Sequence, residues 1–306
     1  MRLKPGRPDL ARLRGRFTVE PARPDDPLAV TWAGVTTLLV DDGATMLLTD
    51  GYFSRPGLAR VALGTVAPAP ARIDGALARL GAHRLAAVIP VHTHLDHALD
   101  SAVVAARTGA RLVGGSSAAQ LGAGAGLPAE RVTVAVPGEP IDLDGYTVTL
   151  IESAHCPPDR FPGVIAAPVV PPVRASAYRC GEAWSVLIAH RPSGRRLLVA
   201  GSAGFRRGAL HGIRAEVVYL GVGQLGVQPQ HYVRDYWDET VGAVGAHTVV
   251  LTHWDDFFRP LTAGLRALPY AVDDLDATLR VLDVLARRDG VTMHFPTLWQ
   301  RENPWG

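Results

Sequence analysis

The stretch VHTHLDH, residues 91 to 97, constrains this chain more than any other part of its sequence. It places three histidines and an aspartate within six positions, directly after LAAVIP, an apolar run typical of a buried strand. If the start of the stretch is extended, His92 and His94 point to the same side and can share one metal ion, because strand side chains alternate. Asp96 and His97 lie where the chain turns into a helix, so they could reach a second ion. Neutral imidazoles and carboxylates bind divalent metals, and packing alone is a poor explanation for four such side chains together.

The same four residues match in full the HxHxDH motif of the metallo-β-lactamase superfamily, and the chain resembles that family. The resemblance implies an α/β fold, a four-layer αββα sandwich of two mixed β-sheets flanked by helices. The order of strands and helices is similar over nearly the whole chain, so we expect one domain spanning residues 1 to 306. The stretches TWAGVTTLLVDDGATMLLTD and HTHLDHALDSA look most like the branch that contains the ascorbate-phosphate lactonase and N-acyl-phosphatidylethanolamine phospholipase D.

The resemblance also implies two more histidine ligands, each following a strand. His155 in IESAHCPP stands where the family has its third histidine, and His253 in VVLTHWDDFF stands where it has its last. By resemblance, the first metal would be held by His92, His94 and His155, and the second by Asp96, His97 and His253.

Ser202, in LLVAGSAGF, departs from the family pattern, which generally has a metal-bridging aspartate at this position. A neutral hydroxyl is a poor ligand and offsets no charge, so we expect a weak or altered second site. Three alternatives follow: one tightly bound metal, two metals bridged mainly by hydroxide, or a carboxylate brought from elsewhere. Asp255 and Asp256 are candidates for that carboxylate, and equally for capping the segment after them. Asp50 resembles the aspartate that the family often places beneath the metals, or else it is an ordinary turn residue.

Three imidazoles around Zn²⁺ leave an open coordination position and can lower the pKa of bound water to about 7. We therefore expect a hydrolase with one or two Zn²⁺ ions, with iron or manganese as alternatives. Its metal-bound hydroxide would attack an ester, lactone, thioester, amide or phosphodiester of a small molecule, and Asp96 would be catalytic by orienting the water or accepting a proton. The competing hypotheses are an iron-dependent oxidoreductase on the same fold and a non-catalytic ligand-binding protein.

Residues 156 to 173 contain six prolines among apolar side chains, which predicts a long, fairly rigid loop. The loop begins directly after His155, so it could wall an apolar pocket over the metals, or it could simply pack on the sandwich. The candidate wall residues are Phe161, Val164, Ile165, Val169 and Val170. His231, in the glycine-containing stretch GVGQLGVQPQHY, is a candidate substrate contact, or else a surface histidine.

Apolar periodicity predicts the remaining elements. We expect a strand hairpin within 29 to 50, helices at 71–83, 97–109, 116–123, 230–244 and 272–288, and strands at 85–92, 111–114, 131–136, 146–153, 183–190, 195–201, 216–221, 247–253 and 291–295.

Charge and composition indicate which classes of partner and which cellular location to expect. The net charge is +2 and the basic residues are dispersed, so a nucleic-acid partner is not expected. No run approaches the roughly 20 apolar residues of a membrane span, and no signal-peptide core follows the basic start. Two cysteines, Cys156 and Cys180, allow at most one disulfide and can equally be small buried hydrophobes. With so few cysteines, a reduced cytoplasm is the expected location. A single lysine among the basic residues, with abundant Ala, Gly and Pro, fits a bacterial origin.

Overall fold

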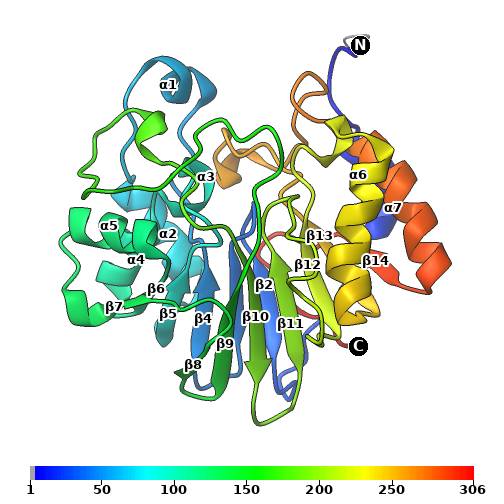
Figure 1. The fold of residues 1–306 in the computed structure, drawn as a ribbon, viewed down its shortest axis with the longest axis horizontal. Helices are drawn as coiled ribbons and strands as arrows, with labels where there is room; N and C mark the ends of the chain where they lie inside the picture. The colour runs from blue at the N-terminus through cyan, green and yellow to red at the C-terminus, as the bar shows by residue number, and fades with distance from the viewer. Residues whose placement is uncertain (1–3) are drawn as a thin grey trace.

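Short apolar strands build two β-sheets that pack face to face, as the computed structural model of residues 4–306 shows (Figure 1). The first sheet is antiparallel from β1 to β4 and parallel from β4 to β7. Its strands in spatial order are β1 (Glu20–Pro21), β15 (Arg301–Asn303), β2 (Ala29–Trp32), β3 (Leu38–Asp41), β4 (Met46–Thr49), β5 (Leu85–Ile89), β6 (Arg111–Gly114) and β7 (Val132–Val134).

The second sheet is also mixed, with a parallel part from β14 to β11 and an antiparallel part from β11 to β8. Its strands in spatial order are β14 (Thr292–His294), β13 (Thr248–Thr252), β12 (Val217–Gly221), β11 (Arg196–Ala200), β10 (Trp184–His190), β9 (Tyr146–Glu152) and β8 (Pro140–Leu143).

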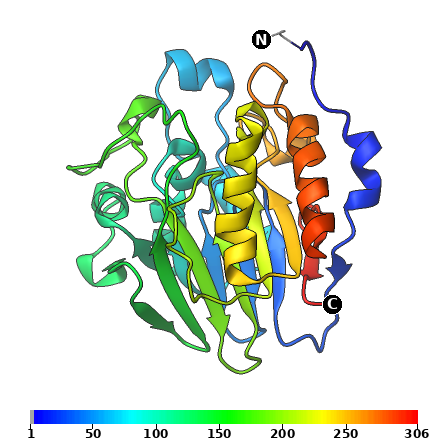
Figure 2. The same ribbon diagram turned by 45° about the vertical axis from the view of Figure 1, so that its right-hand side comes forward.

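Helices cover the outer faces of both sheets. The first sheet has α2 (Pro70–Leu80), α4 (Ser101–Thr108) and α5 (Ser116–Gly124), with α1 (Leu58–Leu63) and α3 (Leu95–Ala98) at one end (Figure 1). On the second sheet α6 (Gln230–Trp237), continued by a π-helical turn at Asp238–Gly242, lies beside α7 (Leu275–Asp289) (Figure 2). Short 3-10 turns occupy Leu10–Arg16, Ala129–Arg131, Ala175–Ala177, Leu225–Val227 and Leu261–Ala263. The predicted four-layer sandwich is therefore confirmed.

Two apolar clusters hold these layers together. Leu47 of β4 belongs to the cluster that lies between the sheets and extends under α6 and α7, together with Trp32, Val186 and Val199. Its neighbour Leu48 belongs to the cluster between the first sheet and its helices. This alternation along one strand is what lets the same four residues contact both layers.

The predicted elements are present, with differences in number and extent. The two strands expected within 29 to 50 are three, because the chain turns at Val35 between β2 and β3. The helix expected over 97–109 is split into α3 and α4, and α3 begins two residues earlier. Asp100, at the split, directs its carboxylate to the backbone N–H groups of Phe53 and Ser54 rather than to a helix cap. The sequence analysis missed α1, β8 and the paired edge strands β1 and β15, which are too short to show a period.

Residues 156 to 173 form no helix or strand, as their prolines predict. Cys156 and Cys180 are both buried free thiols. No helix within residues 4–306 combines the length and the apolar character that crossing a bilayer requires.

Candidate metal centre

The predicted ligands converge at one end of the sandwich, because each of them follows the end of a strand. His92 and His94 follow β5, and the chain then enters α3, which carries Asp96 and His97. His155 lies after β9, and His253 lies directly after β13 of the other sheet. The six side chains therefore come from both sheets.

His92, His94 and His155 form a first group in which one nitrogen of each ring lies within 4.8 Å of the others. The ring centroids are 4.9 Å apart for His92 and His94, 5.0 Å for His92 and His155, and 4.5 Å for His94 and His155. The chain thus brings together the three imidazoles assigned by resemblance to one metal.

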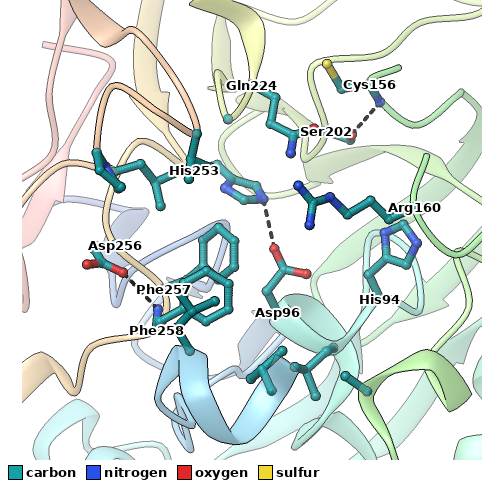
Figure 3. A pocket seen from close by; sticks show the side chains of 18 of the residues that line it. His94, Asp96, Cys156, Arg160, Ser202, Gln224, His253, Asp256, Phe257 and Phe258 are labelled. Atoms are coloured by element: carbon teal, nitrogen blue, oxygen red, sulfur yellow. Dashed lines mark hydrogen bonds and ion pairs between the residues drawn. The ribbon is translucent and has the colours of Figure 1, made fainter. Parts of the chain in front are cut away.

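Asp96, His97 and His253 form a second group beside the first. Nε2 of His253 lies 3.2 Å from Nε2 of His97 and 3.3 Å from Oδ2 of Asp96, as Figure 3 shows for the latter contact. The rings of His92 and His97 are only 4.0 Å apart between centroids, so the two groups share a boundary.

Burial keeps the first group neutral. It lowers the pKa of His92 well below the usual histidine value, lowers that of His94, and lowers that of His155 to about 4. Burial alone would raise the pKa of Asp96, but the adjacent His97 and His253 lower it far below its ordinary value. At neutral pH the first group therefore offers imidazole lone pairs and Asp96 offers a carboxylate, the form in which these groups bind metals. In the second group burial lowers the pKa of His97, but the carboxylates of Asp50 and Asp96 outweigh burial and raise it.

Several nitrogens of this cluster have no hydrogen-bond partner within the described part of the chain. Both ring nitrogens of His92 and Nδ1 of His253 are buried and unpaired. Buried polar atoms in proteins are almost always satisfied, so these atoms require a partner that the chain does not supply. A divalent cation fits, because the donors are nitrogen and carboxylate oxygen atoms at mutual distances typical of ligand sets.

Two carboxylates orient the ligand rings from behind. Oδ2 of Asp50 lies 2.8 Å from Nδ1 of His97, while its Oδ1 accepts the N–H of Val91 at 2.9 Å. Asp159, in the proline-rich loop, places Oδ1 3.1 Å from Nε2 of His94. Such contacts fix a ring's tautomer and direction. Asp50 was a candidate from the sequence, whereas nothing in the sequence singled out Asp159.

The backbone beneath the site is held in an uncommon conformation. Asp50 and His253 have φ values of 51° and 59°, in the left-handed region that side-chain-bearing residues rarely adopt. Gly223 packs so closely that a Cβ there would lie 2.7 Å from Nδ1 of His253. Strain of this kind gathers at functional sites, where the surrounding packing maintains it.

Ser202 and the two candidates for the missing bridging carboxylate, Asp255 and Asp256, lie in different surroundings. Ser202 faces the cavity, and its Oγ accepts the N–H of Cys156 at 3.0 Å (Figure 3). Asp255 forms a buried ion pair with Arg55 and accepts the N–H of Val35 at 2.9 Å. Asp256 binds two arginines and the N–H of Phe258, which matches the capping alternative. Neither aspartate belongs to the two ligand groups.

A cavity of about 440 Å³ opens over the centre, and Figure 3 shows side chains that line it. Phe161 lies on its wall, as expected. The other candidate wall residues do not: Val164 and Val170 are exposed, and Ile165 and Val169 pack in the outer cluster of the first sheet.

His231 is exposed at the start of α6 and outside this cavity, so the structure corrects its prediction as a substrate contact. Gln224 of the same segment lines the cavity instead, together with Arg160, Phe257 and Phe258, none of which the sequence pattern identified.

No protein-family model matches the sequence, and neither does any curated protein. Solved structures do match. A possible metal-dependent hydrolase from Veillonella parvula superposes with a TM-score of 0.57 at 15% identity, covering 90% of this chain and 99% of that one. The metallo-β-lactamase fold protein YhfI from Bacillus subtilis gives a TM-score of 0.50 at 15% identity, covering 90% and 98%. The chain has the metallo-β-lactamase fold.

A diiron enzyme also has a similar fold. CmlA, a diiron β-hydroxylase from Streptomyces venezuelae, matches with a TM-score of 0.54 at 14% identity, covering 93% of this chain and 55% of that one. At such identities a shared metallo-β-lactamase fold does not specify the reaction.

Proposed function

We propose that this chain is a metal-dependent hydrolase of a small-molecule substrate. The observation that carries the proposal is a cluster of histidines with unpaired ring nitrogens beneath an open cavity, which His94, His155 and His253 line. Zinc suits this donor set, and iron or manganese would use the same ligands. The first metal would be held by His92, His94 and His155, and a second, weaker site would use Asp96, His97 and His253.

A divalent ion held there supplies Lewis acidity, which polarises a carbonyl or phosphoryl oxygen and lowers the pKa of water. Asp96 supplies the proton acceptor: its low pKa keeps it ionised, and its carboxylate faces the cavity (Figure 3). Asp50 holds the ring of His97 so that Nε2 faces Asp96 and His253. The apolar cavity wall excludes water from the substrate's scissile bond. Esters, lactones, thioesters, amides and phosphodiesters all suit this arrangement.

Metal analysis and hydrolysis assays on the same protein test the proposal. We expect one to two zinc ions per chain after purification without added metal, and hydrolysis within a panel of p-nitrophenyl esters, lactones and bis(p-nitrophenyl) phosphate. His155→Ala removes a ligand and should abolish both, lowering turnover by about 100-fold or more. His231→Ala, at an exposed histidine outside the cavity, is the matched control and should change neither.

A second candidate is oxygen chemistry at an iron centre, favoured by the likeness to the diiron hydroxylase CmlA. Two iron atoms per chain together with no hydrolysis across the panel would support this candidate. A protein that contains no metal, and binds none when it is supplied, would instead be a ligand-binding relative.

A further inference from the structure

Three arginines line the cavity over the candidate centre: Arg7, Arg160 and Arg266. Two of them already share one carboxylate partner, Asp256. Nη1 of Arg7 donates to Oδ2 of Asp256 at 3.0 Å, and Nε of Arg266 donates to the same oxygen at 2.8 Å. Arg160 differs, because its guanidinium has no hydrogen bond or ion pair with any residue in the range 4–306.

The backbone on either side of Arg160 is tied to the site. Asp159 contacts Nε2 of His94 at 3.1 Å, and its Oδ1 also accepts the N–H of Phe161 at 3.0 Å. The carbonyl of Phe161 accepts the N–H of Cys180 at 2.8 Å. Arg160 therefore projects from a fixed position rather than from a free loop. In Figure 3 its guanidinium reaches over the cavity toward Asp96, between His253 and His94.

This cation stands beside a centre that would hold one or two dications, and the usual bridging carboxylate is replaced by Ser202. Like charges that lie close together repel each other unless an anion lies between them. A guanidinium is a planar fork that matches the oxygens of a carboxylate or phosphate. Phe257, Phe258 and Leu268 add apolar surface to the wall of the same cavity.

We infer that Arg160 binds an oxyanion of the ligand, a carboxylate or a phosphate, while an apolar portion of the same ligand lies against Phe257 and Phe258. On this basis the substrate class is a small amphiphilic anion. The inference rests on the proposed function only in calling that ligand a substrate, since the anion site itself requires no turnover.

Calorimetric binding of three probes with the same heptyl chain tests this inference: octanoate, heptyl phosphate and octanamide. We expect the full chain to bind at least one anion more tightly than the neutral amide, and the preferred anion identifies the headgroup. Arg160→Gln should weaken anion binding by about 10-fold and leave amide binding unchanged. Arg160→Lys should recover part of the loss. Arg174→Gln, an equal charge change at an exposed position outside the cavity, should have no effect.

Equal affinity for all three probes, or an Arg160→Gln protein that keeps its anion affinity, overturns the inference. So does an equal loss in Arg174→Gln, which would reveal a general charge effect. Measuring both zinc-loaded and chelated protein separates this result from the proposed function. Arg160-dependent anion binding without hydrolysis would reject only the hydrolase, and hydrolysis with no role for Arg160 in binding would reject only the anion site.

Discussion

Ser202 is the residue at which this centre differs from the pattern that its histidines follow. Its hydroxyl accepts a backbone hydrogen bond from Cys156 and brings no charge to the cavity. The nearby carboxylates of Asp255 and Asp256 are bound to arginines, so neither is free to replace the missing bridge. The charge of a second dication would then be offset mainly by Asp96.

Ser202→Asp should therefore raise the occupancy of the second site. The added carboxylate offsets charge and supplies a hard oxygen ligand, so we expect the metal content to increase toward two ions per chain. Plasma mass spectrometry of the variant, beside wild type and Ser202→Ala, measures this content. A stoichiometry that stays the same in all three proteins would mean that another group already completes the second site.

The residues of the centre differ in how far sequence could predict them. His92, His94, Asp96 and His97 are close in sequence, and strand alternation alone indicated their grouping. His155 and His253 required the family resemblance, because nothing local distinguishes a histidine at a strand end. Asp159 and Arg160 could not be predicted, since their contacts depend on how a loop of irregular backbone folds over His94.

At the scale of elements, the long apolar runs in the sequence predicted strands correctly, whereas the sequence analysis missed the shortest strands. The last strand, β15, has only the residues Arg301–Asn303, and its sequence is polar. It nevertheless lies between β1 and β2, where Glu302 is fully buried. Three residues are too few to show an alternation of apolar and polar side chains. The burial of this carboxyl group therefore becomes evident only from the strand pairing in the structure.

Glu302 should make the stability of this sheet edge depend on pH. Burial raises its pKa to about 8, whereas one oxygen accepts only the N–H of Thr297 and the other has no partner among residues 4–306. The folded state thus holds a proton that the unfolded chain releases above pH 4.5. Its stabilising contribution is complete below that pH and is lost as the pH rises through about 8.

Glu302→Gln keeps the shape of the side chain and removes its titratable carboxyl group. Relative to wild type, we expect the variant to gain about 4 kcal/mol between pH 5 and pH 9. Urea unfolding at several pH values measures this difference. Glu130→Gln, at an exposed position, serves as the control and should follow wild type throughout. A constant offset between Glu302→Gln and wild type would show that Glu302 does not titrate in this range.

At the scale of the whole molecule, the centre lies at the seam between the two sheets. His92, His94, Asp96 and His97 follow β5 of the first sheet, while His155 and His253 follow strands of the second. Neither sheet alone supplies a complete ligand group. The ligands meet only when the apolar cluster between the sheets has formed, and sequence could predict this meeting only through the fold that it resembles.

A metal held across that seam should stabilise the whole fold, because it binds the assembled sandwich and not the separated sheets. Binding adds about 4 kcal/mol to the free energy of unfolding when free metal exceeds Kd 1,000-fold. Removing it with a chelator should therefore lower Tm by on the order of 10 °C, and restoring zinc should reverse the change. Calorimetric scans measure this shift.

The dependence on both sheets makes this expectation specific. His92→Ala from the first sheet and His155→Ala from the second should each remove most of the zinc-dependent rise in Tm, whereas His231→Ala should retain it. If only the His92 variant lost the rise, the ion would be held by the 92–97 segment alone. The metal would then not stabilise the contact between the two sheets. The unpaired nitrogens of His92 and His253 would need another explanation.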